Sequence, residues 1–214
     1  MASSPSLFAR SYARVLKVLA RSGTRLLLVN LGDPNPHIAF PELPPGYTAE
    51  PKQPVDLLPW ATSEHGLNET FLRQASKRGD RCVANFYHGD LVGYGFVTRC
   101  FAPVTEQIGV RVGAGLQYRY KGWTHPAHRR KHLSHARGRL NSRLFPQTPG
   151  QCMVSYVEAH NFASRLTHAD VRPIFLGCCL IVSVLGREYP INSPSAKRFG
   201  LELVHLNREG AVLA

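Results

Sequence analysis

The residue types best suited to chemistry gather in one short segment, between Thr124 and Arg137. Three consecutive cations, Arg129, Arg130 and Lys131, stand there between the end of a predicted strand and the start of a predicted helix. The first amides of a helix have no partner within the helix, and together with the helix dipole they attract anions. Cations beside those amides add charge that a phosphate can use. The segment therefore predicts a site for a phosphate-bearing ligand, and a pyrophosphate is its natural occupant.

Histidines in the same segment offer a second interpretation, because their spacings of three and four residues suit metal ligands on one helix face: His125, His128, His132 and His135. Pro126 prevents one continuous helix across all four. No cysteine or carboxylate lies nearby, and the intervening Arg and Lys side chains would repel a metal cation. We therefore expect no metal, and a solvated basic helix start without a ligand is the remaining alternative.

The chain has an excess of positive charge, and this excess is concentrated in two segments. The 214 residues include 26 Lys and Arg against 14 Asp and Glu, a formal net charge of +12. Residues 1–32 hold five basic side chains and residues 107–157 hold nine, and neither block contains an acid. Such a field indicates a polyanionic partner, which is a nucleotide, a nucleic acid or an anionic surface. Apolar residues make up 43% of the chain, so a disordered chain without a core is excluded.

The elements that must position the basic segment mix strands and helices. Helical spacing and capping residues predict helices over residues 7–21, 68–78, 132–145 and 161–169. Apolar and β-branched runs predict strands over residues 25–31, 47–51, 81–88, 91–100, 116–124, 152–158 and 174–185. Gly89-Asp90 is expected to be the tight turn of a hairpin.

Three further stretches are less regular. Residues 33–59 carry eight of the sixteen prolines and are expected to be mostly loop or extended chain. Residues 102–115 are expected to be a linker with room for a short strand, and residues 196–206 a last helix start or strand. The order of all elements predicts an α/β fold of the mixed α+β kind, with a mixed sheet and helices on its faces.

The segment after the strand 116–124 resembles the signature of the GNAT superfamily of acyl-CoA-dependent N-acyltransferases, Val-x-Pro-x-x-Arg-x-x-Gly-x-Gly/Ala. In this chain the pattern falls on Thr124, Pro126, Arg129, His132 and Ser134. His132 stands where the family has a glycine, Ser134 where it has a small residue, and Thr124 where it has an apolar one. The loop is therefore more crowded than is usual, and it gains a possible imidazolium near the phosphates.

The resemblance covers about residues 46–206 and includes the order of the flanking strands and helices. It implies a GNAT-like central mixed sheet with splayed strands, flanked by helices. The acyltransferase domain is then expected over residues 46–214. An extension of amphipathic helix, strand and proline-rich linker would precede it over residues 1–45.

The resemblance also implies how an acyl donor, acetyl-CoA or another acyl-CoA, is held without a metal. Its pyrophosphate would lie against the backbone of Arg129, Arg130, Lys131, His132, Leu133 and Ser134. Its pantetheine arm would pair with the end of the preceding strand at Trp123 and Thr124. Asn161 and Ser164 match an Asn-x-x-small motif, in which Asn161 would contact the same arm or cap the helix that follows.

Acyl transfer to an amine needs a group that accepts the amine proton and one that protonates the departing thiolate. Glu158 is the only carboxylate between Gln107 and Ala169, so it is the candidate for the first task, although it could equally pair with a neighbouring arginine. For the second task the family commonly places a tyrosine seven residues after the Asn of its motif. That position is His168 here, and Tyr156 is the alternative.

Aromatic residues alternate along the strand before the basic segment, at Tyr118, Tyr120 and Trp123. They line an acceptor or acyl pocket, or they belong to the core. Both interpretations stay open on the sequence.

The acid-free N-terminal segment, residues 1–23, has three interpretations. It is a helix packed on the domain, a mitochondrial presequence, or a basic helix that lies on a membrane or docks a partner such as an acyl carrier protein. The five cysteines are odd in number and lack a CxxC pair, which favours a reducing compartment. We expect a cytoplasmic protein, or a mitochondrial matrix protein if the presequence interpretation holds. No segment is long and apolar enough to be predicted to cross a bilayer.

The sequence therefore predicts an N-acyltransferase that moves an acyl group, in the first instance acetyl, from acyl-CoA to a primary amine of a small molecule or peptide. One alternative is long-chain acyl transfer from an acyl carrier protein. Another, from a different class, is a basic nucleic-acid-binding protein. The sequence disfavours this last one, because the larger set of cations surrounds a single phosphate-sized turn and no nucleic-acid-binding motif is present.

Overall fold

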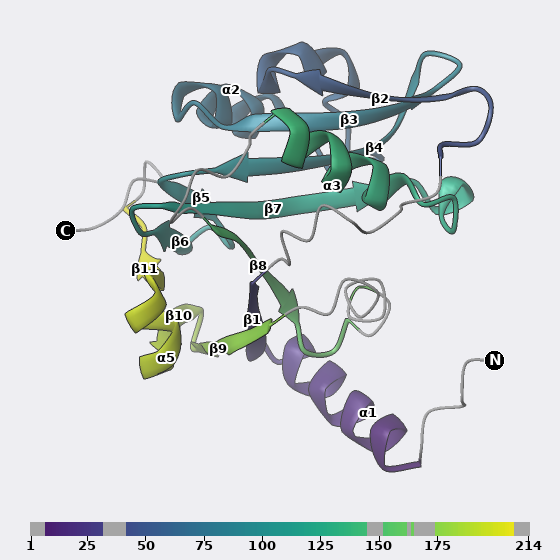
Figure 1. Ribbon diagram of the computed structural model, residues 1–214. Coiled ribbons are helices and arrows are strands. Elements are labelled where there is room, and N and C mark those ends of the chain that lie inside the picture. The colour runs from purple at the N-terminus through teal and green to yellow at the C-terminus, as the bar shows by residue number, and fades with distance from the viewer. Residues whose placement is uncertain (1–6, 32–41, 145–151, 162–163, 165–173, 208–214) are drawn as a thin grey trace. The chain divides into compact units, whose positions relative to one another are not determined.

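The computed structural model describes residues 7–31, 42–144, 152–161, 164 and 174–207, and of residues 7–13 it gives the backbone only (Figure 1). The chain divides into two compact units. Unit 1 comprises residues 1–33, 101–113 and 154–214, and unit 2 comprises residues 34–100 and 114–153.

The strands of unit 2 are antiparallel neighbours in the order β2 (Tyr47–Lys52), β3 (Arg81–Tyr87), β4 (Asp90–Thr98) and β7 (Leu116–Thr124). The predicted position of the hairpin turn was wrong by one residue. Tyr87 already pairs with Asp90, so His88 and Gly89 form the turn, with φ of 49° and 95°. A turn with two positive φ values matches the twist of the strands on either side, and this favours the observed position.

The helices of unit 2 are the short helix η1 (Pro54–Trp60), α2 (Glu69–Lys77), η2 (Pro126–His128) and α3 (Leu133–Leu144). α2 begins where the sequence predicted, because the Asn68 side chain accepts a hydrogen bond from the Phe71 amide at 2.8 Å. η1 lies in the stretch that was expected to be mostly loop. Proline at the first helical position has a φ suited to a helix start, so it permits this turn as well as a loop.

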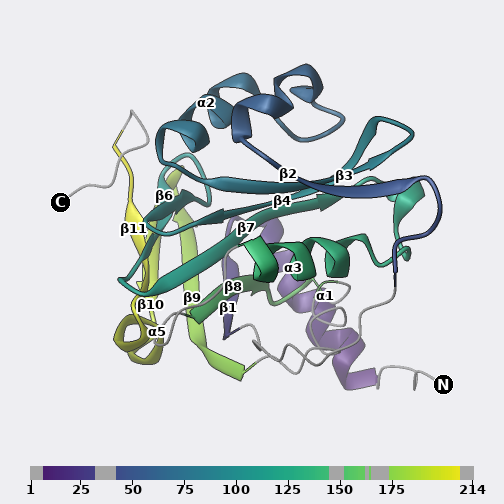
Figure 2. The ribbon, with the colours of Figure 1, turned by 45° about the horizontal axis from the view of Figure 1, so that its top comes forward.

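α2 and α3 cover opposite faces of the unit 2 strands (Figure 2). Phe71 of α2 packs edge-to-face on Phe96 of β4, with 5.1 Å between the ring centroids. On the other face, Gly93 and Gly95 of β4 lie against Arg137 of α3. This follows from the alternation of side chains along a strand.

Aromatic side chains fill the core of unit 2 on the α2 face. Tyr118 and Tyr120 are buried there with Tyr94 and Phe96, so these two residues of β7 belong to the core. Trp123 is only half-buried and stacks on Tyr94, with 5.5 Å between the ring centroids.

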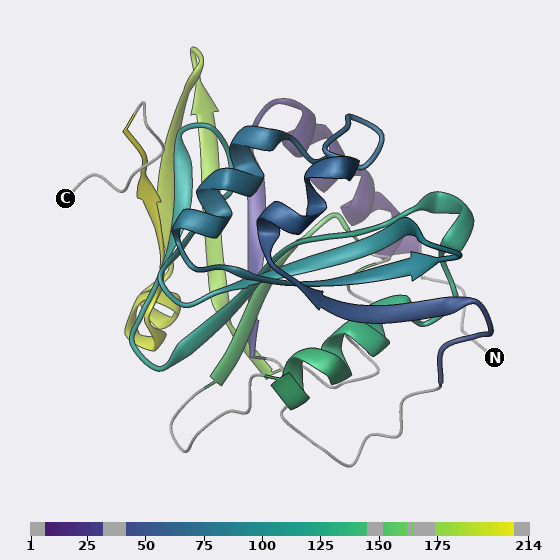
Figure 3. The same ribbon diagram turned by 90° about the horizontal axis from the view of Figure 1, so that it is seen from above.

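Unit 1 contains α1 (Leu7–Arg21), β1 (Arg25–Leu31), β9 (Ile174–Val184), β10 (Arg187–Asn192) and most of β8 (Cys152–Glu158). β1 pairs antiparallel with β8 on one side and with β9 on the other. β9 and β10 form a long hairpin, drawn in yellow-green in Figure 3. β10 was not predicted, because its polar residues and Pro190 are unfavourable in a central strand. They are tolerated because β10 stands at one end of the strand order.

A second sheet of unit 1 has three strands, in the order β11 (Leu201–His205), β6 (Ile108–Val112) and β5 (Phe101–Pro103). The predicted linker therefore holds two short strands rather than one. α5 (Pro194–Phe199) precedes β11, so the tail contains both a helix and a strand.

The structure confirms the predicted α/β class and the bounds of α1, β1, β7 and β8. Most of the helix predicted over residues 161–169 lies outside the described residues, and Ser164 is helical. The predicted domain boundary after residue 45 stays a prediction. Among the described residues, no helix is both long and apolar enough to span a membrane.

Candidate functional site

The basic segment forms the strand-to-helix turn that the sequence predicted. β7 ends at Thr124, Pro126 opens the short helix η2, and α3 begins at Leu133. The first intrahelical bond at this end of α3 runs from the Ala136 amide to the His132 carbonyl, 3.1 Å. The amides of the first turn before Ala136 therefore have no carbonyl within the helix to bind, and they can serve an anion.

Two residues of the turn adopt the left-handed conformation that favours glycine, namely Arg130 with φ of 63° and His132 with φ of 56°. His132 occupies the glycine position of the signature, and its φ is one that glycine adopts more readily than other residues. A non-glycine residue in this region costs about 1–2 kcal/mol. Strain of this kind persists where the surrounding structure imposes it, and it is frequent at ligand sites.

Two of the three cations of the turn are exposed, and Lys131 is half-buried. Arg129 and Arg130 are exposed, and in the part of the chain that the structure describes none of Arg129, Arg130 and Lys131 forms an ion pair. Arg129 donates from Nε to the Thr124 carbonyl at 3.4 Å, and the Lys131 ammonium lies 5.1 Å from the ring centroid of Tyr47. These side chains are therefore held beside the helix start with their charge uncompensated.

The histidines of the segment form two separate pairs. His125 and His128 lie with ring centroids 5.3 Å apart, and His132 stacks on His135 at 5.5 Å. The described residues contain no group of three or more side chains arranged to hold a metal ion.

His128 ties the turn to strand β2. Its Nδ1 lies 2.8 Å from the hydroxyl of Tyr47. Burial lowers the pKa of His128, and the neighbouring His125 and Lys131 lower it further. Burial first, and these neighbours second, thus favour the neutral form of the histidine that contacts the strand.

Arg137 carries a buried charge under α3 that the sequence analysis did not single out. The residue is 7% exposed, and its side chain donates to the Asn85 side-chain oxygen Oδ1 at 2.5 Å and to the Thr124 hydroxyl at 3.2 Å. Gly93 leaves room for it, since a Cβ there would lie 2.6 Å from Nη1. Among the described residues no carboxylate pairs with Arg137, and burial lowers its pKa to about 10. Because it holds Thr124, Arg137 supports the point where β7 enters the basic turn.

Glu158, the predicted proton acceptor, belongs to a charged cluster of unit 1. It ends β8 and forms a close ion pair with Arg25, the first residue of β1. Its second oxygen, Oε2, lies 3.2 Å from Nε2 of His160. The arginine partner that the sequence left open is therefore present, and His160 is an addition that sequence reasoning missed. Its position two residues after Glu158 was the available signal.

Of the other predicted site residues of unit 1, the structure describes Asn161, Ser164 and Tyr156 but not His168. Asn161 accepts a hydrogen bond from the Ser164 amide at 3.1 Å, so it caps the helical turn that follows. Tyr156 lies on β8, half-buried, and pairs with Val29. His168 lies outside the described residues. The roles of Tyr156 and His168 stay predictions.

No protein-family profile matches this chain, and no curated protein sequence is similar to it. Solved structures do align with it. A Drosophila protein aligns with 86% of this chain and 58% of its own length, at 12% identity and a TM-score of 0.52. A GCN5-related N-acetyltransferase from Sphaerobacter thermophilus aligns with 89% of this chain and 56% of its own length, at 13% identity and a TM-score of 0.48. A tandem GNAT protein from the clavulanic acid biosynthesis pathway aligns with 96% of this chain and 61% of its own length, at 14% identity and a TM-score of 0.46.

The Drosophila protein shares the fold of this chain. The hairpin of β3 and β4, the long strand β7, the basic turn, α3 and β8 come in the order that the resemblance implied, with β5 and β6 inserted between β4 and β7. The chain spans about three fifths of the length of each of the three solved structures named above, from 56% to 61%. At these identities the similarity concerns the fold alone.

Proposed function

We propose that this protein is an N-acyltransferase that uses an acyl-CoA, with acetyl-CoA as the simplest donor, and a primary amine as acceptor. One observation carries the proposal. The turn between β7 and α3 combines unpaired helix-start amides, left-handed backbone at the glycine position of the signature, and three cations without acidic partners among the described residues. A pyrophosphate satisfies all three features.

In the proposed reaction the neutral amine nitrogen attacks the thioester carbonyl, a C–N bond forms and the C–S bond breaks. The amine gives one proton to the carboxylate of Glu158 or to a water bound to it. The thiolate leaves and takes a proton from Tyr156 or His168. The products are an amide and free coenzyme A, so atoms and charge balance without a metal or an oxidant.

Arg25 and His160 would assist Glu158 in this role. The Arg25 ion pair fixes the carboxylate at the end of β8, and His160 lies within hydrogen-bond distance of its other oxygen. A proton that reaches Glu158 can therefore pass on to the imidazole.

The proposal is tested by titrating coenzyme A into the protein at low salt in a calorimeter. We expect binding, and we expect the paired substitution Arg129→Ala with Arg130→Ala to weaken it by about tenfold, since two charge-assisted contacts to phosphate are removed. The matched control is Arg139→Ala with Arg143→Ala, which removes the same charge from α3 beyond the turn.

Absence of coenzyme A binding by the unchanged protein would overturn the proposal. Equal losses in the two pairs would do the same, because the effect would then come from net charge and not from the turn. A random single-stranded oligonucleotide titrated in parallel addresses the nucleic-acid alternative, which requires affinity that falls steeply with salt.

A further inference from the structure

A cleft of about 520 Å³ opens in unit 1 beside the C-terminal half of α1. Within the described residues, the side chains that line it come from α1, from β1 and from the end of β8: Lys17, Ala20, Arg21, Arg25, Glu158 and His160. The turn between β7 and α3 belongs to unit 2, and none of its residues is among those that line the cleft.

The lining carries an excess of positive charge. Arg25 is neutralised by its ion pair with Glu158. Lys17 and Arg21 are both exposed, and neither forms an ion pair with any residue that the structure describes. They are four residues apart on α1 and therefore project from the same side of the helix. Two adjacent free cations form a favourable site for a carboxylate or a phosphate.

The same cleft holds groups suited to an amine. Glu158 accepts from Arg25 through one oxygen and faces His160 through the other, 3.2 Å away. A ligand ammonium can donate to this carboxylate, and His160 can exchange a proton with it. The cleft therefore offers cations to one end of a small ligand and an acid–base pair to the other.

An apolar hollow of about 100 Å³ adjoins these groups, because His160 also lines it. Its apolar lining comes from Leu16, Leu19, Leu26, Ala159 and Leu180. A short carbon stem between an amine and an anion would find apolar contact here.

We propose that the cleft binds a small primary amine that also carries a negatively charged group, a carboxylate or a phosphate. Lys17 and Arg21 bind the anion, and Glu158 with His160 binds the amine. The assignment of this ligand as the acyl acceptor rests on the proposed function, whereas its binding does not.

Binding is measured first without any acyl donor, by calorimetric titration at low salt with matched pairs of ligands. The pairs are phosphoethanolamine against ethanolamine, and β-alanine against propylamine. We expect the anionic member of at least one pair to bind about tenfold more tightly than the neutral member. The stronger pair then tells whether the cleft prefers phosphate or carboxylate.

The paired substitution Lys17→Met with Arg21→Met is expected to abolish this preference. The matched control is Arg187→Met with Arg198→Met, two exposed cations of unit 1 outside the cleft lining, and it should leave the preference intact. Ethyl phosphate, an anion without an amine, tests the other end of the ligand. It should bind more weakly than phosphoethanolamine, and Glu158→Gln should reduce that difference.

Equal affinity within both pairs, no binding of either anionic amine, or an unchanged preference in Lys17→Met with Arg21→Met would each overturn the proposal. Ethyl phosphate binding as tightly as phosphoethanolamine would also overturn it, because the cleft would then not recognise the amine. The coenzyme A titration fails or succeeds independently. If this protein binds anionic amines but not coenzyme A, the ligand proposed for the cleft stands and the proposed acyltransferase function is rejected.

Discussion

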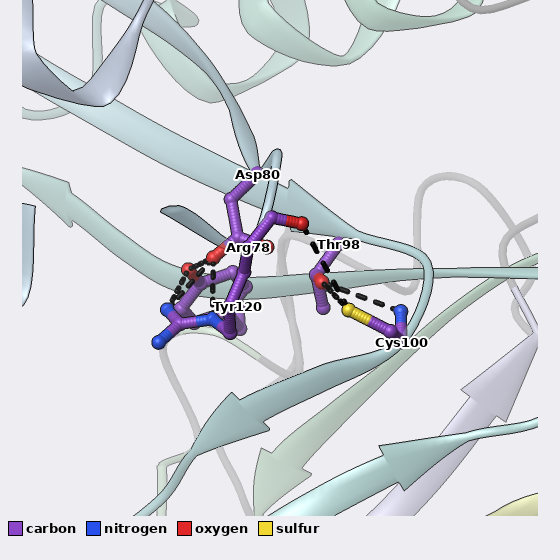
Figure 4. Close-up of polar contacts among 5 residues, drawn as sticks. All are labelled: Arg78, Asp80, Thr98, Cys100 and Tyr120. Carbon is purple, nitrogen blue, oxygen red and sulfur yellow. Dashed lines mark hydrogen bonds and ion pairs between the residues drawn. The ribbon is translucent and has the colours of Figure 1, made fainter. Parts of the chain in front are cut away.

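Two arginines of unit 2, Arg78 partly buried and Arg137 buried, lie in opposite electrostatic settings. Arg78 follows α2 and donates to Asp80 at 2.7 Å, while Tyr120 donates to the same carboxylate oxygen at 2.5 Å (Figure 4). Burial lowers the pKa of Arg78, but the Asp80 carboxylate and Tyr120 raise it by more, and the net shift is upward. Burial and the neighbouring Asp80 together raise the pKa of Tyr120. The charge of Arg78 is thus balanced where it is buried.

Arg137 has only neutral oxygen partners, from Asn85 and Thr124, and its pKa falls to about 10. Arg119 also lowers it, because that second cation lies under the same helix α3. A buried cation without an acid is costly to a fold. The charge of Arg78 is therefore compensated by an acid, and this arrangement favours stability. The charge of Arg137 is not compensated by any acid among the described residues, and it lies on the α3 side of the strands, where the candidate anion site is.

The largest expected effect is on the balanced arginine. Asp80→Asn should lower the free energy of unfolding by about 3 kcal/mol, since it leaves Arg78 buried without its partner. Urea denaturation followed by circular dichroism measures this. Tyr120→Phe removes one hydrogen bond to the carboxylate and should cost less, about 1.5 kcal/mol. Coenzyme A affinity should stay unchanged in both variants that fold.

A stability loss below about 1 kcal/mol in Asp80→Asn would break the comparison. Arg78 would then tolerate burial without an acid as Arg137 does, and the contrast between the two sides of the unit would disappear.

Replacing the unbalanced arginine should affect stability less and coenzyme A binding more. Arg137→Met removes an uncompensated cation and fills its space with an apolar chain, so the free energy of unfolding should change by less than about 1 kcal/mol. Coenzyme A affinity should fall by about tenfold, because Thr124 loses its support and the turn loses a nearby charge. Calorimetry and urea denaturation on the same sample separate the two effects.

Arg137→Lys is the control, since it keeps the charge but not the two-pronged geometry. It should retain part of the affinity. A variant Arg137→Met that binds coenzyme A as well as the unchanged protein would show that this arginine is a structural residue only.

The smallest expected effect concerns His128, whose neutral form is favoured by burial, His125 and Lys131. Its folded pKa lies below the ordinary value near 6.5, so the folded protein resists protonation at this site more than the unfolded chain does. The stability that His128 contributes is present above pH 6.5 and is lost as the pH falls through the folded pKa.

His128→Asn should therefore reduce the drop in melting temperature between pH 7 and pH 5 by a few degrees at most. The exposed His205→Asn serves as the control and should leave that drop unchanged. If the melting temperature falls equally with pH in His128→Asn and in the unchanged protein, the neutral form of His128 is not favoured by folding, and the prediction is wrong.

The sequence by itself determined the parts that depend on neighbours in the chain. Apolar alternation set the bounds of β7, Pro126 ended the strand, and the cations follow at the start of α3. Each of these depends on local propensity and on the restricted φ of proline. The candidate pyrophosphate turn could therefore be located without coordinates.

Only the tertiary structure decided which charges meet. Arg25 and Glu158 are 133 residues apart and pair because β1 and β8 are neighbours. Arg137 stands at a helical position that reads as exposed and basic, yet it is buried because Gly93 and Gly95 open a space beneath α3. Burial and partner choice depend on the packing of distant segments, and the energy of a charge depends on both. The sequence therefore shows which charged side chains the protein has, whereas only the structure shows which of them are buried and which of them pair.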